Sequence, residues 1–160
     1  AKMKIISKET TRKINVENFF IEYGLQAINA KEYIHDFEIP NPKTKQFDFI
    51  AYKVSKRRYE DISTITGAFF FEKKLNKKSN VRFAYGGMAG VPMRSKSLEN
   101  LFYQKFESNF DEKSIEMAIK NDFQPLTDCR ATSLYRHRVA ENLFKKFSCF
   151  VKNTLNIKEI

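Results

Sequence analysis

The glycine-rich segment at residues 83–94 most constrains how this chain can fold. Its sequence is FAYGGMAGVPMR, and it holds three of the five glycines in 160 residues. It overlaps the end of an apolar run at residues 81–85, whose composition is typical of a strand. Two adjacent glycines after a strand indicate backbone that a side chain would obstruct, through a positive φ angle or a close approach of another segment. We therefore expect a tightly packed corner at Gly86 and Gly87.

The first half of the chain alternates between apolar and polar residues, which predicts strands. Residues 33–39 and 47–54 both alternate in this way. The polar, proline-containing residues 41–46 between them favour a turn, so we expect the two strands to pair as an antiparallel hairpin. The apolar run at residues 62–72 and the later strand at residues 81–85 extend this pairing into a meander.

The second half of the chain shows apolar residues at helical spacing. Residues 96–106 predict one helix, Asp111 is a candidate N-cap for a second, and Thr132 or Ser133 is one for a long last helix. The positions assigned to the buried stripe of the last helix are Leu134, Val139, Leu143, Phe147, Phe150, Val151 and Leu155. Strands followed by helices predict an α+β fold, with an antiparallel sheet of three to four strands and helices packed on one face.

Several segments together resemble a known family. In chain order they are Arg12, VENFFIEYG (residues 16–24), residues 30–40, YKVSKRRYEDIS (residues 52–63), YGGMA (residues 85–89) and TDCRATSLYR (residues 127–136). Their order resembles the C-terminal domain of the FAD-binding subunit of xanthine dehydrogenase-like molybdenum hydroxylases, the CO dehydrogenase flavoprotein C-terminal domain family. The chain departs from the family pattern at Tyr59, where an acidic residue is common, and at Glu60, where aspartate is common.

The resemblance implies a part of a larger enzyme. Residues 1–12 would be the end of a preceding FAD-binding domain, and residues 13–160 the flavoprotein C-terminal domain. This domain would form one wall of the flavin and NAD site, while the Fe–S clusters and molybdopterin belong to other domains. The complete enzyme would oxidise purines or related heterocycles and pass electrons through Fe–S clusters and FAD to NAD. Its partners would be the FAD-binding domain, a molybdopterin-binding subunit and NAD, and the isolated chain would be inactive.

Lys53 is the best single candidate for a site residue. It lies in phase with Ala51 on an alternating strand and therefore potentially points inward, where an ammonium group needs a charge partner. The alternative is a lysine that extends its ammonium group to the rim. The resemblance implies that Lys53 approaches the flavin, that Ile34 packs on its ring, and that Tyr23 and Glu60 lie on the NAD side. No catalytic residue or metal ligand is expected in this chain.

Other polar residues near the last helix have a structural interpretation. Asp128 and Arg130 flank the predicted helix start, where they can cap the helix and pin the preceding loop. Tyr135 and Arg136 are expected to serve packing and domain docking.

The net charge of +10 raises a second class of function, because lysine and arginine side chains can bind nucleic acid through its phosphates. The basic residues are spread over turns without a nucleic-acid-binding motif, which favours a solvated surface. A basic nucleic-acid-binding domain and a non-catalytic interaction domain of the same fold remain the alternatives.

The apolar runs are too short for a membrane span, and Cys129 and Cys149 lack metal-ligand spacing. We therefore expect a cytoplasmic protein with reduced thiols.

Overall fold

The chain divides into two compact units, Ala1–Thr44 and Lys45–Ile160. The structure, a computed structural model, describes residues 1–40, 47–59, 62–72, 80–105 and 109–154. Each unit has sheets of its own. The predicted boundary after residue 12 stays a prediction, although residues 2–6 pair within the first unit.

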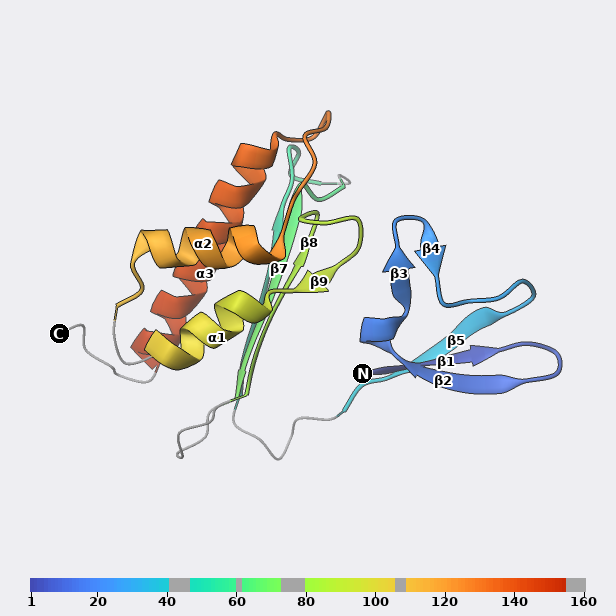
Figure 1. Cartoon of the computed structure of the whole chain (residues 1–160). Helices are drawn as coiled ribbons and strands as arrows, with labels where there is room; N and C mark the ends of the chain where they lie inside the picture. Colours follow the sequence, from blue (N-terminus) through green and yellow to red (C-terminus); the bar gives the residue numbers. More distant parts are fainter. Residues whose placement is uncertain (41–46, 60–61, 73–79, 106–108, 155–160) are drawn as a thin grey trace. The chain divides into compact units, whose positions relative to one another are not determined.

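The first unit is an antiparallel sheet with a small hairpin (Figure 1). Its sheet has the strand order β2-β1-β5, with β1 at Lys2–Ile6, β2 at Thr11–Asn15 and β5 at Tyr33–Glu38. A short 3-10 turn, η1 (Val16–Asn18), leads into the hairpin of β3 (Phe20–Glu22) and β4 (Leu25–Gln26). The buried core of this unit consists of Met3, Ile5 and Phe19.

The predicted hairpin between residues 33–39 and 47–54 is wrong. Strand β5 pairs with β1, with Met3 opposite Phe37, whereas β6 (Phe47–Val54) pairs with β7 (Ile65–Glu72) along its whole length. Alternation identifies each strand and its two faces, but it carries no information about the partner strand. The predicted turn at residues 41–46 lies outside the described residues.

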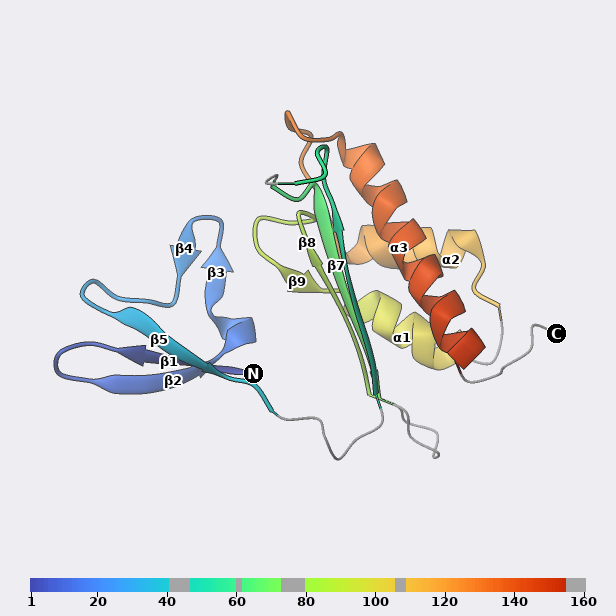
Figure 2. The same ribbon diagram turned by 180° about the vertical axis from the view of Figure 1, so that it is seen from behind.

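The second unit is a four-stranded antiparallel sheet in the order β6-β7-β8-β9. Strand β8 spans Val81–Gly86 and β9 spans Met93–Arg94. Its helices are α1 (Lys96–Lys105), α2 (Glu112–Asp122) and α3 (Ser133–Thr154). Figures 1 and 2, which view the molecule from opposite sides, both place the three helices on one face of this sheet. The predicted meander and the α+β fold are confirmed.

Stacked and edge-on phenylalanine rings fill the space between the sheet and the helices. Phe83 on β8 is fully buried, and its ring centroid lies 5.7 Å from that of Phe69, 5.3 Å from Phe102, 5.5 Å from Phe144 and 5.4 Å from Phe147. Such offset and edge-to-face arrangements are the favoured packing of aromatic rings. The abundance of phenylalanine in the sequence therefore serves this core.

The buried face of α3 differs in part from the predicted stripe. Leu143, Phe147 and Val151 are buried as predicted and Val139 packs against the core, but Leu134 is 70% exposed and Phe150 is 40% exposed. Leu155 lies outside the described residues. The core face instead includes Ala140 and Phe144, and one turn before Ala140 the buried position belongs to Arg136. Because this buried position is occupied by a charged residue, the pattern of apolar residues alone did not identify which face of α3 is buried.

The predicted helix starts are confirmed. The carboxylate of Asp111 accepts a hydrogen bond from the backbone N–H of Ser114 at 2.8 Å, which caps α2. At α3, the Oγ1 atom of Thr132 accepts from the N–H of Tyr135 at 3.2 Å, so Thr132 is the cap of the last helix.

Candidate functional site

The helices leave one face of the second sheet uncovered. Alternate residues of β6 point to that face, and Ala51 and Lys53 are exposed there. Lys53 lies opposite Thr66, which lies opposite Gly86. The next cross-strand row consists of Ala51, Ala68 and Ala84. Small residues in both rows leave a flat surface beside the Lys53 side chain.

The inward orientation considered for Lys53 is wrong with respect to the core, although its phase with Ala51 is right. Ile50, Tyr52 and Val54 occupy the core side of β6, where the Tyr52 ring lies 6.1 Å from that of Phe69. The ammonium group of Lys53 therefore remains in water, and it requires no anionic partner for folding.

The other predicted ligand contacts lie in the first unit or outside the described residues. Ile34 on β5 is 37% exposed, and Tyr23 is 89% exposed in the turn between β3 and β4. Glu60 lies outside the described residues. The convergence of Ile34, Tyr23 and Glu60 with Lys53 on one ligand stays a prediction.

The corner expected at the glycine pair is confirmed at Gly87. This residue has a φ angle of +79°, and a Cβ atom added to it would lie 2.4 Å from the carbonyl oxygen of Thr64. The positive φ angle and the close backbone contact both favour glycine. At Gly86 the nearest atom to an added Cβ would be 3.7 Å away, an ordinary contact. The need for glycine is thus confined to the second residue of the pair.

Arg136 holds this corner against the last helix. Its Nη1 atom donates hydrogen bonds to the carbonyl oxygens of Thr64 at 2.5 Å and Gly87 at 2.8 Å. Its Nη2 atom donates to both carboxylate oxygens of Asp128, at 2.8 and 2.9 Å. Arg136 is only 4% exposed, so its role is packing within the unit.

Asp128 pins the loop before α3, as expected. Its Oδ1 atom accepts from the N–H groups of Ala131 at 3.1 Å and Arg130 at 2.9 Å. The hydrogen bond from Ala131 and the Arg136 guanidinium lower the pKa of Asp128 to about 2. Because this carboxylate accepts four hydrogen bonds from its own unit, its role is structural.

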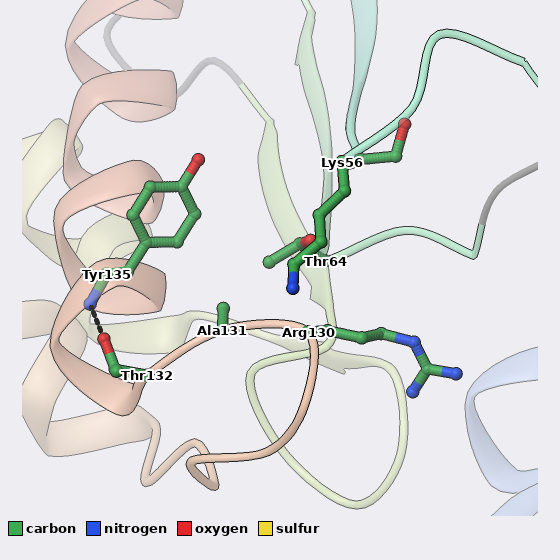
Figure 3. A pocket seen from close by; sticks show the side chains of 7 residues that line it. Lys56, Thr64, Arg130, Ala131, Thr132 and Tyr135 are labelled. Atoms are coloured by element: carbon green, nitrogen blue, oxygen red, sulfur yellow. Dashed lines mark hydrogen bonds between the residues drawn. The ribbon is translucent and has the colours of Figure 1, made fainter.

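A pocket of about 350 Å³ opens beside this loop and is shown in Figure 3. It is lined by Ser55, Lys56, Thr64, Arg130, Ala131, Thr132 and Tyr135. The Nζ atom of Lys56 donates a hydrogen bond to the carbonyl oxygen of Cys129 at 2.7 Å, which ties the two sides together. Sequence reasoning missed this pocket because its two halves are about seventy residues apart and no local pattern connects them.

An arginine–glutamate pair organises the first unit. Both oxygens of Glu32 accept from Arg12 at 2.8 Å, and Glu32 also accepts from the N–H of Asn29 at 2.6 Å. The Arg12 guanidinium and then the Asn29 N–H lower the pKa of Glu32 to about 2. Arg12 and the turn before Glu32 belong to the segments that carry the family resemblance, so that part of the pattern has a structural role.

Other kinds of site find little support in the part of the chain that the structure describes. Within it, no three His, Cys, Asp or Glu residues gather in a way that could hold a metal ion. Cys129 and Cys149 are free and exposed. None of the helices described is both long and apolar enough to cross a membrane. His35 forms an exposed pair with Asp36, at 2.6 Å between Nδ1 and Oδ2.

Comparisons with known proteins agree on one family and one fold. Residues 50–149 match the sequence model of the CO dehydrogenase flavoprotein C-terminal domain. The glyceraldehyde dehydrogenase medium chain of Sulfolobus acidocaldarius is 26% identical over 144 residues, which are 88% of this chain and 49% of that protein.

Two solved structures share the fold. Quinoline 2-oxidoreductase from Pseudomonas putida 86 superposes with a TM-score of 0.69 at 16% identity, over 91% of this chain and 50% of that one. Carbon monoxide dehydrogenase from Hydrogenophaga pseudoflava superposes with a TM-score of 0.68 at 17% identity, over the same shares. The chain thus spans about half the length of the relatives it matches.

Proposed function

Because this chain belongs to the CO dehydrogenase flavoprotein C-terminal domain family, we propose that it forms one wall of a flavin site in a larger molybdenum hydroxylase-type oxidoreductase. The observation that carries the proposal is the position of Lys53. Its side chain is exposed on the sheet face that the helices leave uncovered, inside the segment that matches the family. An ammonium group beside a flat surface suits a planar, electron-rich ligand.

The residues around Lys53 fit a flavin ring. Thr66, Gly86 and the row of three alanines next to them project little from the sheet, so a planar ring can approach it closely. A bound flavin would supply two-electron transfer to a nicotinamide. The Lys53 ammonium group has three N–H donors, which can bind a ring carbonyl and stabilise negative charge on the ring. The family resemblance assigns a packing contact with the ring to Ile34, an exposed apolar residue of the first unit.

The activity of the complete protein is part of the same proposal. Enzymes of this kind carry FAD, and their Fe–S clusters and molybdopterin belong to other domains or subunits. We infer a xanthine dehydrogenase-like reaction in which electrons from a heterocycle reach FAD and then NAD, with Tyr23 and Glu60 on the NAD side. The FAD-binding domain and a molybdopterin-binding subunit would be the partners. The two unpaired, exposed cysteines support a reducing, cytoplasmic location.

The first test is Lys53→Ala in the complete enzyme. We expect FAD content or NAD reduction to fall about tenfold, as for the loss of a hydrogen bond to a charged group. Oxidation of the heterocycle with an artificial acceptor at the molybdenum site should stay normal, since only the flavin end is changed. Lys113→Ala removes an exposed charge from α2 and is the matched control. Normal FAD content and normal NAD reduction in Lys53→Ala would remove Lys53 from the site.

The second test uses the 160-residue chain alone. One wall of a pocket offers only part of the contacts that a cofactor needs to overcome the cost of association. We expect the purified chain to lack a flavin absorbance band after size-exclusion chromatography with added FAD. Stoichiometric FAD retained by the chain would contradict the proposal that it supplies only one wall.

A further inference from the structure

The pocket beside the start of α3 has the composition of an anion site. Among the described residues that line it, the charged ones are Lys56 and Arg130, and both are cationic. We propose that this pocket binds a phosphoryl group, free or as a phosphate monoester. The inference is independent of the flavin proposal, because Lys53 and the uncovered sheet face take no part in it.

Thr64 supplies the observation that points to a ligand. Thr64 is only 3% exposed, and it lines the pocket. Its backbone N–H donates to Val54 and its carbonyl oxygen accepts from Arg136. Within the described part of the chain, the Thr64 hydroxyl has no hydrogen-bond partner. The hydroxyl is not sealed off from solvent at the pocket, and it is free to donate a hydrogen bond to a phosphoryl oxygen.

Lys56 is positioned to donate to the same ligand. In Figure 3 its side chain extends past Thr64 toward the loop of Ala131. The bond to the Cys129 carbonyl uses one of the three N–H donors of its ammonium group, which leaves two for an anion. That bond also holds the side chain in place, so less rotamer entropy is lost when the anion binds.

The start of α3 adds a positive potential on the opposite side. Thr132 caps this 22-residue helix and lines the pocket together with Tyr135. The N–H groups of Ser133 and Tyr135 already donate to the hydroxyl oxygens of Thr127 and Thr132, so the first turn attracts an anion through the helix dipole. The carboxylate of the adjoining loop, Asp128, is paired with the Arg136 guanidinium, which offsets its negative charge. Glu60 and Asp61 lie outside the described residues.

The size and the apolar part of the lining suggest how much of a ligand is held. About 350 Å³ is at the small end of the range for small-molecule sites, enough for a phosphate group and the first part of its ester. The Tyr135 ring borders the pocket across from Thr64 (Figure 3) and can pack on a flat group. A nucleoside monophosphate and inorganic phosphate are the two sources to compare.

The test is an NMR titration of the ¹⁵N-labelled chain with inorganic phosphate and, separately, AMP, each at constant ionic strength. We expect saturable shifts of the amides of Thr64 and of residues 131–135. Lys56→Gln should weaken binding about tenfold, as for a lost charge-assisted hydrogen bond. Thr64→Val, which keeps the side-chain shape, should weaken it about threefold. Lys56→Arg should retain binding, and Lys113→Gln is the control for an equal change in net charge.

Each outcome decides the proposal. Tighter binding of AMP than of phosphate identifies a nucleotide site, and the reverse identifies a site for the free anion. The proposal is overturned if neither compound gives saturable shifts at these amides. It is also overturned if Lys113→Gln weakens binding as much as Lys56→Gln, or if Thr64→Val leaves the dissociation constant unchanged.

Discussion

The two units of this chain bury apolar side chains to very different extents. Among the described residues, the core of the second unit holds nineteen buried residues, whereas that of the first holds three. In the first unit, β5 exposes Tyr33 and Phe37, each by more than half. Burial of apolar surface is the main source of folding free energy. We therefore expect the first unit to depend more on charged pairs, and to open before the second.

The largest expected effect is that of Phe83→Ala in the second unit. Phe83 contacts four aromatic rings and is fully buried, so its truncation should lower the free energy of unfolding by about 3–5 kcal/mol. Urea denaturation measures this change. Phe19→Ala in the first unit is the companion variant, and its effect on hydrogen exchange should be confined to β1, β2 and β5. If Phe83→Ala lowered the free energy of unfolding less than Phe19→Ala does, the second unit would not be the one that depends more on its apolar core.

Gly87→Ala tests the corner that joins the second sheet to α3. The substitution places a side chain at positive φ and against the Thr64 carbonyl, which should cost about 1–3 kcal/mol. Gly86→Ala is the matched control, because an added Cβ there makes an ordinary contact. Thermal unfolding of both variants gives the comparison. Equal melting temperatures for the two variants would show that the close contact at Gly87 does not constrain the fold.

Acid should unfold the first unit before the second. The pKa of Glu32 lies at about 2 instead of 4.5, so the folded first unit holds fewer protons on this group than its unfolded form. The stabilisation of the first unit by the ionised Glu32 carboxylate is therefore complete above pH 4.5 and is lost as the pH falls toward 2. NMR signals of β1 and β2 should disappear in this window before those of β7 and β8. Although Asp128 has a similar pKa, its unit retains the larger apolar core.

Glu32→Gln provides the control for this acid transition. The variant should destabilise the first unit at neutral pH and make its unfolding less dependent on pH between 4.5 and 2. Loss of the β7 and β8 signals at or before the loss of the β1 and β2 signals would contradict the proposed order.

The smallest expected effect is that of Phe37→Ala, the same substitution as at Phe83 but in the first unit. Phe37 is 54% exposed on β5, so the free energy of unfolding should change by about 0.5 kcal/mol or less. If Phe37→Ala changed the free energy of unfolding more than Phe19→Ala does, the Phe37 side chain would have to be covered in solution.

Local sequence patterns located the main strands and helices of the second unit. Alternation located β6, and apolar runs located β7 and β8. The capping residues Asp111 and Thr132 located the starts of α2 and α3. The glycine pair indicated a corner, because positive φ and close backbone contact are properties of one residue and its nearest neighbours. The family resemblance rested on such segments, and the match over residues 50–149 agrees with it.

Only the tertiary structure decided which elements meet. The partner of β5 is β1, and the helices cover the face of β6 opposite Lys53. Neither fact could be predicted from the sequence pattern, because the alternation of one strand encodes neither its partner strand nor the face that is covered. Arg136 occupies a core position on α3 because the carbonyl oxygens of Thr64 and Gly87, far away in sequence, accept its hydrogen bonds. The pocket between Lys56 and α3 arises in the same way, from side chains that only long-range packing brings together.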